Sequence, residues 1–135
     1  MNQQIALKTF EPVILPEQLT SYFKAVNAQR ALSAADLFCE PGVLVAPLGV
    51  QVRGREAIAA YLADKCSGMT LYPEQVEIVA PSVIVVMGYV KCSAFNVNVE
   101  WKFHLIGAEI AVLQVRLLAS LQQLSHLRNS KYAAT

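Results

Sequence analysis

The feature that most restricts the fold of this chain is a regular alternation of side chains between Asn96 and Ile106. The apolar positions are Val97, Val99, Trp101, Phe103 and Leu105, and the polar ones between them are Asn98, Glu100, Lys102 and His104. Successive side chains of a β-strand point to opposite faces, so this pattern predicts a strand with one buried and one solvated face. Such a strand needs neighbouring strands and a cover for its apolar face.

Three segments rich in β-branched and aromatic residues supply those neighbours. They run from Thr70 to Val79, from Val83 to Cys92 and from Glu109 to Ala119. The connections at 80–82 and 106–108 contain proline or glycine and are short, as hairpins require. The second half of the chain therefore predicts an antiparallel meander.

The first half of the chain shows helical periodicity. Leu19, Tyr22, Phe23 and Val26 form an apolar stripe at i, i+3, i+4 and i+7, which predicts a helix over about 16–29. The other expected elements are helices at Leu32–Phe38 and Arg55–Lys65, a hairpin that pairs Gly42–Ala46 with Val50–Arg53, and a final helix after Ser120. Pro41 and Gly42 are expected to end the second helix.

Helices followed by a meander indicate an α+β fold. We expect a curved, mostly antiparallel sheet wrapped round the N-terminal helices, forming a cone with an apolar interior that suits a small-molecule site. The expected organisation is an arm at 1–15, one domain at 16–130 and a tail at 131–135.

The composition is unusually apolar. Apolar residues make up 55% of the chain and charged residues 16%, against about 45–50% and about 25% in typical domains. The excess apolar surface must line a ligand cavity, form a subunit interface, or both. The net charge is +1 and the basic residues are scattered, which argues against binding to nucleic acid or to an anionic membrane surface.

Membrane and metal classes are also disfavoured. The longest apolar stretch, Val83–Val90, is far shorter than the roughly 20 residues that span a bilayer, and no signal peptide is evident, so we expect a cytoplasmic protein with no integral membrane segment. Cys39, Cys66 and Cys92 are odd in number and widely spaced, which predicts small apolar side chains rather than disulfides or a zinc site. His104 and His126 lack the spacing of metal ligands.

Six segments carry a resemblance to a known family. They are YFKAVNA (22–28), DLFCEPGVLVAP (36–47), VRGREAIAAYLADKC (52–66), LYPEQ (71–75), NVEWKF (98–103) and RLLAS (116–120). In their order and spacing the chain resembles the nuclear-transport-factor-2-like superfamily, which includes ketosteroid isomerases. It is most similar to the C-terminal domain of cyanobacterial orange carotenoid proteins and to the stand-alone homologues of that domain. The resemblance implies a dimeric carotenoid carrier with a role in photoprotection, which exchanges pigment with a helical carotenoid protein.

The resemblance also assigns roles to residues. In ketosteroid isomerases a helix tyrosine and a strand aspartic acid donate hydrogen bonds to the steroid oxygen, and an aspartate before a proline is the general base. Here the donor positions hold Tyr22 and Trp101, and the base position holds Ala46, which still precedes Pro47. Alanine cannot accept a proton, so the resemblance implies binding without catalysis.

In the carotenoid proteins a tyrosine and a tryptophan bind the ring carbonyl of the pigment. The resemblance therefore implies that Tyr22 and Trp101 hold the carbonyl of a ketocarotenoid such as canthaxanthin or echinenone. The implied tunnel walls are Val26, Cys66, Met69, Leu71, Val90, Phe95 and Val115. The chain departs from the full-length carotenoid proteins at two places. Those proteins have an acidic residue at the position of Lys65, which pairs with their helical domain, and their segment corresponding to 91–98 is longer and contains an additional tryptophan.

Two other functions stay open at this point. An enzyme of the isomerase or cyclase kind requires a carboxylate or histidine inside the cone; Glu40 is one candidate, but we expect it at a helix end facing water. An assembly domain requires only a dimer interface and leaves the cone empty or filled with lipid. From the residues alone, Tyr22 and Trp101 also fit as core aromatics bonded to backbone or water. Cys92, near the expected tunnel mouth, is the candidate for a redox switch.

Overall fold

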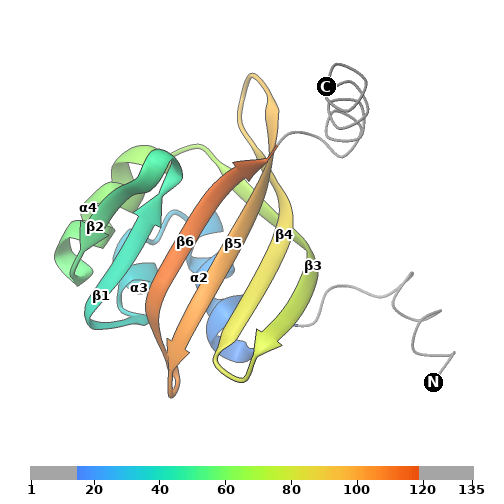
Figure 1. Cartoon of the computed structure of the whole chain (residues 1–135). Helices are drawn as coiled ribbons and strands as arrows, with labels where there is room; N and C mark the ends of the chain where they lie inside the picture. The colour runs from blue at the N-terminus through green and yellow to red at the C-terminus, as the bar shows by residue number, and fades with distance from the viewer. Residues whose placement is uncertain (1–14, 119–135) are drawn as a thin grey trace, which may run out of the picture.

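The computed structural model describes residues 15–118 (Figure 1). Its helices are α2 (Glu17–Asn27), α3 (Ala31–Ala35), α4 (Arg55–Lys65) and the short 3₁₀ helix η1 (Pro47–Gly49). Its strands are β1 (Phe38–Ala46), β2 (Val50–Arg53), β3 (Thr70–Ala80), β4 (Val83–Lys91), β5 (Asn96–Ile106) and β6 (Glu109–Leu118). The predicted final helix, the tail and nearly all of the arm lie outside the described residues, so the predicted domain bounds stay a prediction.

The strands form one six-stranded sheet in the order β2-β1-β6-β5-β4-β3. Neighbours are antiparallel except β1 and β6, which run parallel. The sheet curves around α2 and α3, and α4 lies beside β1 and β2 (Figure 1). The expected α+β fold, a mostly antiparallel curved sheet around the N-terminal helices, is confirmed. No helix among the described residues is long and apolar enough to cross a bilayer.

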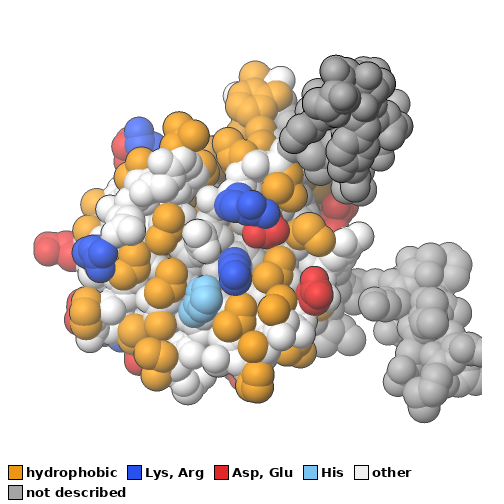
Figure 2. All heavy atoms as spheres, in the orientation of Figure 1, with side chains coloured by type: hydrophobic (Ala, Val, Ile, Leu, Met, Phe, Trp, Pro, Cys, Tyr) orange, Lys and Arg blue, Asp and Glu red, His pale blue; other side chains and the backbone are white. Residues whose placement is uncertain are grey.

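The alternation in β5 decides which face of the sheet meets the helices. Trp101 pairs with Val86 of β4 and with Val115 of β6, so that apolar side chains from three strands share the concave face. The stripe predicted on α2 packs against this face, and Leu19, Tyr22, Phe23 and Val26 are all buried. By the alternation of β5, Glu100, Lys102 and His104 lie on the convex face, and Arg116 lies there too because it pairs with Glu100. Figure 2 shows charged side chains among apolar ones on one face of the molecule. Arg116 donates two hydrogen bonds of 3.1 Å to the carboxylate of Glu100 across this face.

Two predictions near β1 were wrong. The second helix ends at Ala35 rather than at Phe38, and the strand begins at Phe38 rather than at Gly42. The cause is tertiary pairing, because Phe38 pairs with Ile110 of β6 and the backbone N–H of Ile110 donates to the carbonyl of Leu37 at 2.9 Å. The β1–β6 register shifts between Phe38 and Val43, so the Pro41–Gly42 pair interrupts a strand instead of ending a helix. Glu40 accordingly lies within β1, where it is exposed.

Candidate functional site

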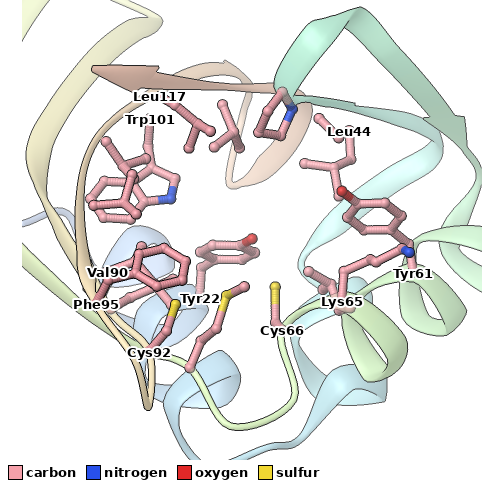
Figure 3. A pocket seen from close by; sticks show the side chains of 18 residues that line it. Tyr22, Leu44, Tyr61, Lys65, Cys66, Val90, Cys92, Phe95, Trp101 and Leu117 are labelled. Atoms are coloured by element: carbon pink, nitrogen blue, oxygen red, sulfur yellow. The ribbon is translucent and has the colours of Figure 1, made fainter. Parts of the chain in front are cut away.

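A cavity of about 260 Å³ opens between α2, α4 and the concave face of the sheet (Figure 3). Of the residues singled out from the sequence, it brings together Tyr22, Cys66, Met69, Leu71, Val90, Phe95, Trp101 and Val115. The remaining lining residues are Leu44, Ala46, Pro47, Tyr61, Leu62, Lys65, Cys92, Val97, Val99 and Leu117. The predicted donors and nearly all of the predicted walls therefore share one cavity.

Val26 is the exception, because it does not line this cavity; its place beside a bound ligand stays a prediction. Its side chain is 3% exposed and lines a separate hollow of about 100 Å³, together with Leu62 and Cys66. Val26 lies one helical turn beyond Tyr22 on α2. One turn advances about 5.4 Å along the helix axis, and Val26 there lies at a neighbouring hollow that shares Leu62 and Cys66 with the cavity.

The two donor side chains point into the cavity. Tyr22 and Trp101 are each 2% exposed, and Figure 3 shows the phenol oxygen and the indole nitrogen facing the same empty space. Neither atom has a hydrogen-bond partner among residues 15–118, and no fully enclosed side-chain nitrogen or oxygen in that range lacks one. Both donors are therefore open to the cavity. Because buried polar groups are nearly always paired, the arrangement calls for an acceptor in the cavity.

Aromatic packing holds these donors in place. The ring of Tyr22 makes edge contacts with Phe23, Phe38 and Phe103 at centroid distances of 5.6, 6.2 and 5.8 Å. Phe23 in turn contacts Trp101. Edge-to-face pairs prefer a defined geometry, so the two polar atoms are oriented before any ligand arrives.

The titratable groups of the cavity are neutral or lie at its edge. Burial raises the pKa of the Tyr22 hydroxyl well above its ordinary value, with smaller contributions from Cys66 and Tyr61. Burial, and secondly Cys92, raises the pKa of the Cys66 thiol to about 11. Both groups are protonated at neutral pH and can donate hydrogen bonds. Lys65 pairs with Asp64 at 3.6 Å, and both side chains are mostly exposed.

The described lining of the cavity offers no conventional base for proton abstraction. No carboxylate or imidazole is among the described residues that line it. Ala46, which the family resemblance matches to the isomerase base, is 2% exposed and lines the cavity beside Pro47. General-base catalysis needs an acceptor within hydrogen-bond reach of the substrate. The described lining can hold and polarise a carbonyl group but offers it no conventional base.

Sequence reasoning missed part of the lining. Tyr61 and Lys65 lie four residues apart on α4 and both reach the cavity, a spacing that places them on one helix face. Val97 and Val99 were predicted to point inward but were not assigned to the cavity wall, although they share the face of Trp101. The alternation in β5 was a sufficient signal for these two valines.

Sequence reasoning also missed a set of hydrogen bonds from Asn27 and Gln29, at the end of α2, to the 66–71 segment. The side-chain amide of Asn27 donates to the carbonyl of Leu71 at 2.9 Å, and its oxygen accepts from the Leu71 N–H at 2.7 Å. The Gln29 side chain donates to the carbonyl of Cys66 at 3.5 Å and accepts from the N–H of Gly68 at 3.4 Å. These bonds tie the end of the helix that carries Tyr22 to the 66–71 segment of the cavity wall.

Comparison with known proteins bears on the fold and on the site. No protein-family model and no curated protein matches the sequence. Among solved structures, the orange carotenoid protein of Anabaena (Nostoc) sp. PCC 7120 binding canthaxanthin is 27% identical, with a TM-score of 0.72 over 82% of this chain and 39% of that one. A protein from Sphaerobacter thermophilus is 27% identical, with a TM-score of 0.67 over 77% of this chain and 95% of that one.

An enzyme shares the fold as well. The epoxide hydrolase/cyclase-like enzyme SalBIII is 18% identical, with a TM-score of 0.68 over 77% of this chain and 90% of its own. Structures described as nuclear-transport-factor-2-like and ketosteroid-isomerase-like have the same architecture. The chain thus has the nuclear-transport-factor-2-like fold, and its structural neighbours include both a carotenoid-binding protein and an enzyme. It spans only 39% of the length of the carotenoid protein.

Proposed function

We propose that this protein binds an apolar ligand that carries a carbonyl group, most specifically a ketocarotenoid such as canthaxanthin or echinenone, and catalyses no reaction on it. The observation that supports this proposal is a pair of donors, Tyr22 and Trp101, that face one apolar cavity and have no hydrogen-bond partner among residues 15–118. The described lining of that cavity holds no carboxylate or imidazole. The similarity to a canthaxanthin-binding protein favours the same ligand class.

The cavity assigns different tasks to its apolar and polar parts. Burying about 300 Å² of apolar ligand surface would contribute roughly 8 kcal/mol, and two hydrogen bonds about 1–3 kcal/mol together. Association costs of roughly 4–15 kcal/mol offset much of this. The apolar wall therefore supplies most of the affinity, whereas the two donors orient the carbonyl end.

The size of the cavity bears on the assembly. Its volume of about 260 Å³ is below the roughly 300–1,000 Å³ of typical small-molecule sites. It suits the ring of a carotenoid and a few carbons of its polyene, but not the whole pigment. A homodimer in which a second subunit covers the other end would bury the rest. Exchange with a helical carotenoid protein, as part of cytoplasmic photoprotection, is the corresponding cellular role.

The enzymatic alternative lacks support in the described lining. An isomerase or cyclase of this fold would need a proton acceptor beside the ligand carbonyl. Glu40 is exposed on β1 and does not line the cavity. A domain that only assembles would not need a phenol and an indole N–H on the wall of one apolar cavity, so that alternative leaves the placement of Tyr22 and Trp101 unexplained.

Pigment binding can be tested directly. The protein is expressed in a canthaxanthin-producing bacterium, purified, and its visible spectrum recorded. We expect coloured protein with about one pigment for every one or two subunits. Colourless protein, from cells that demonstrably contain canthaxanthin, would contradict the ketocarotenoid proposal.

A further inference from the structure

The described lining of the cavity holds a single charged side chain, Lys65, at the end of α4. This side chain is 61% exposed, whereas Tyr22 and Trp101 are each 2% exposed. The two donors therefore lie deep in the cavity, and the positive charge lies at its entrance. A ketocarotenoid such as canthaxanthin is uncharged and offers this cation no group to bind.

Tyr61 accompanies Lys65 on the same face of α4. The two residues are four apart in the helix, a spacing that brings side chains together, and both line the cavity. Figure 3 shows them across the cavity from Trp101. Burial raises the pKa of the Tyr61 hydroxyl, with smaller contributions from Cys66 and Asp64. The hydroxyl keeps its proton at neutral pH, so this edge of the cavity carries a hydrogen-bond donor next to a cation.

Both groups are available to a ligand. The ion pair of Lys65 within residues 15–118 joins it to the adjacent Asp64 at 3.6 Å, and the Asp64 side chain is 74% exposed. Exposed ion pairs of this kind contribute little because water screens them, so the ammonium group can turn to another anion at small cost. The Tyr61 hydroxyl has no hydrogen-bond partner in the same range. The two oxygens of a carboxylate can accept hydrogen bonds from an ammonium group and from a phenol together.

We propose that Tyr61 and Lys65 bind a carboxylate at the entrance of the cavity, and that the protein accordingly binds compact oxo-carboxylic acids. Such a ligand has a ketone on an apolar ring at one end and a carboxylate on a short chain at the other. The ketone meets Tyr22 and Trp101, so the inference rests on the proposed function at the buried end and adds a second ligand class to it. The volume of about 260 Å³ is too small for a whole carotenoid but suits one ring with a short chain.

The test uses abscisic acid and its methyl ester as probes. Both carry a ketone on a six-membered ring and a short chain that ends in the carboxyl group, and only the acid is charged at pH 7. Isothermal titration calorimetry measures their affinities for wild type, Lys65→Gln and Tyr61→Phe. The matched control is Lys24→Gln, because Lys24 is an exposed lysine in the last turn of α2 and does not line the cavity.

We expect wild type to bind the acid about tenfold more tightly than the ester, since hydrogen bonds between charged groups are roughly twice as strong as neutral ones. Lys65→Gln should remove this preference by weakening acid binding alone. Tyr61→Phe should reduce the preference about two- to fivefold, and Lys24→Gln should leave it unchanged. Equal affinities of wild type for acid and ester, or a Lys65→Gln variant that weakens both alike, would overturn the carboxylate proposal and leave the carbonyl site standing.

The same titrations separate this proposal from the proposed function. A protein that binds canthaxanthin but neither probe would refute the carboxylate site alone. A preference for the acid that depends on Lys65, with affinities for both probes unchanged in the double variant Tyr22→Phe and Trp101→Phe, would support the carboxylate contact and contradict the carbonyl contact. Binding of neither canthaxanthin nor either probe would refute both.

Discussion

The ring of Phe23 meets the ring of Trp101 edge to face, with centroids 4.9 Å apart and planes inclined at 85°. The same phenylalanine contacts Tyr22 at 5.6 Å. Phe23 thus touches both of the side chains whose polar atoms face the cavity, although it does not line the cavity itself. Its position explains how two donors on different elements keep a fixed relation to each other.

Replacing Phe23 should make the positions of the two donor side chains less fixed without changing the residues that line the cavity. We expect Phe23→Leu to lower the free energy of unfolding by about 1–2 kcal/mol, since the aromatic contacts and part of the buried volume are lost. In pigment-loaded protein the visible band should broaden because the two donors become less fixed. Urea denaturation and the visible spectrum measure the two effects. The matched variant Phe95→Leu, at an exposed residue, should leave the free energy of unfolding within about 0.5 kcal/mol of wild type. A Phe23→Leu variant as stable as this control would contradict the claim that the Phe23 ring holds Tyr22 and Trp101 in place.

The amide of Asn27 is expected to matter more than its exposed position on α2 suggests. Asn27→Ala removes two hydrogen bonds to Leu71 and should lower the free energy of unfolding by about 1–3 kcal/mol. Lys24→Ala, on an exposed position of the same helix, serves as the control and should have little effect. Hydrogen exchange of the Leu71 amide offers a local reading, because its protection should fall in Asn27→Ala alone. Unchanged protection would show that the Asn27 side chain is not needed to hold the 66–71 segment in place.

Alkaline pH should destabilise the fold through the cavity. Burial raises the pKa of Cys66 from 9.0 to about 11, so the folded protein retains a proton that the unfolded chain gives up. The stabilisation is complete below about pH 9 and is lost as the pH rises towards 11, at no more than about 1.4 kcal/mol per pH unit for one proton. The raised pKa of Tyr22 adds a loss of the same sign at higher pH. Urea denaturation under reducing conditions should give a steeper decline for wild type than for Cys66→Ser between pH 9 and 11, and parallel curves would contradict this.

A carboxylate introduced at the position of the isomerase base should harm the site. Ala46→Asp places an ionisable group on an apolar cavity wall, and we expect it to lower stability at pH 7 by about 1–3 kcal/mol and to reduce pigment binding. The control Ala46→Asn has nearly the same size but no charge. Burial should raise the pKa of the new carboxyl, so the Asp variant should approach the Asn variant in stability as the pH falls towards about 4. Equal stability of the two variants at pH 7 would indicate that position 46 is more hydrated than the structure implies.

The sequence predicts those parts of the fold in which a local pattern and a buried face coincide. The bounds of β5 agree with the prediction because the residues from Asn96 to Ile106 alternate between apolar and polar, and this alternation matches a strand with one buried face. The start of β1 could not be predicted, because Phe38 becomes a strand residue only by pairing with Ile110, far away in the chain. The same limit applies to the bonds of Asn27 and Leu71, which lie 44 residues apart.

The candidate site divides in a similar way. Family resemblance identified Tyr22 and Trp101 as a pair, and the structure brings them into one cavity. The same resemblance placed Val26 in the wall, whereas in the structure Val26 lines a neighbouring hollow. Helical periodicity shows that Val26 is buried but not which of two adjacent hollows it faces.

The most direct test of the account is the infrared carbonyl stretching frequency of a bound ketone, recorded for wild type, Tyr22→Phe, Trp101→Phe and the double variant. Hydrogen bonds to a carbonyl oxygen weaken its C=O bond. We expect the lowest frequency in wild type, an intermediate one in each single variant, and in the double variant a value close to that of the ketone in an apolar solvent. A bound ketone with the same frequency in wild type and in the double variant would contradict the claim that these two side chains hold the carbonyl.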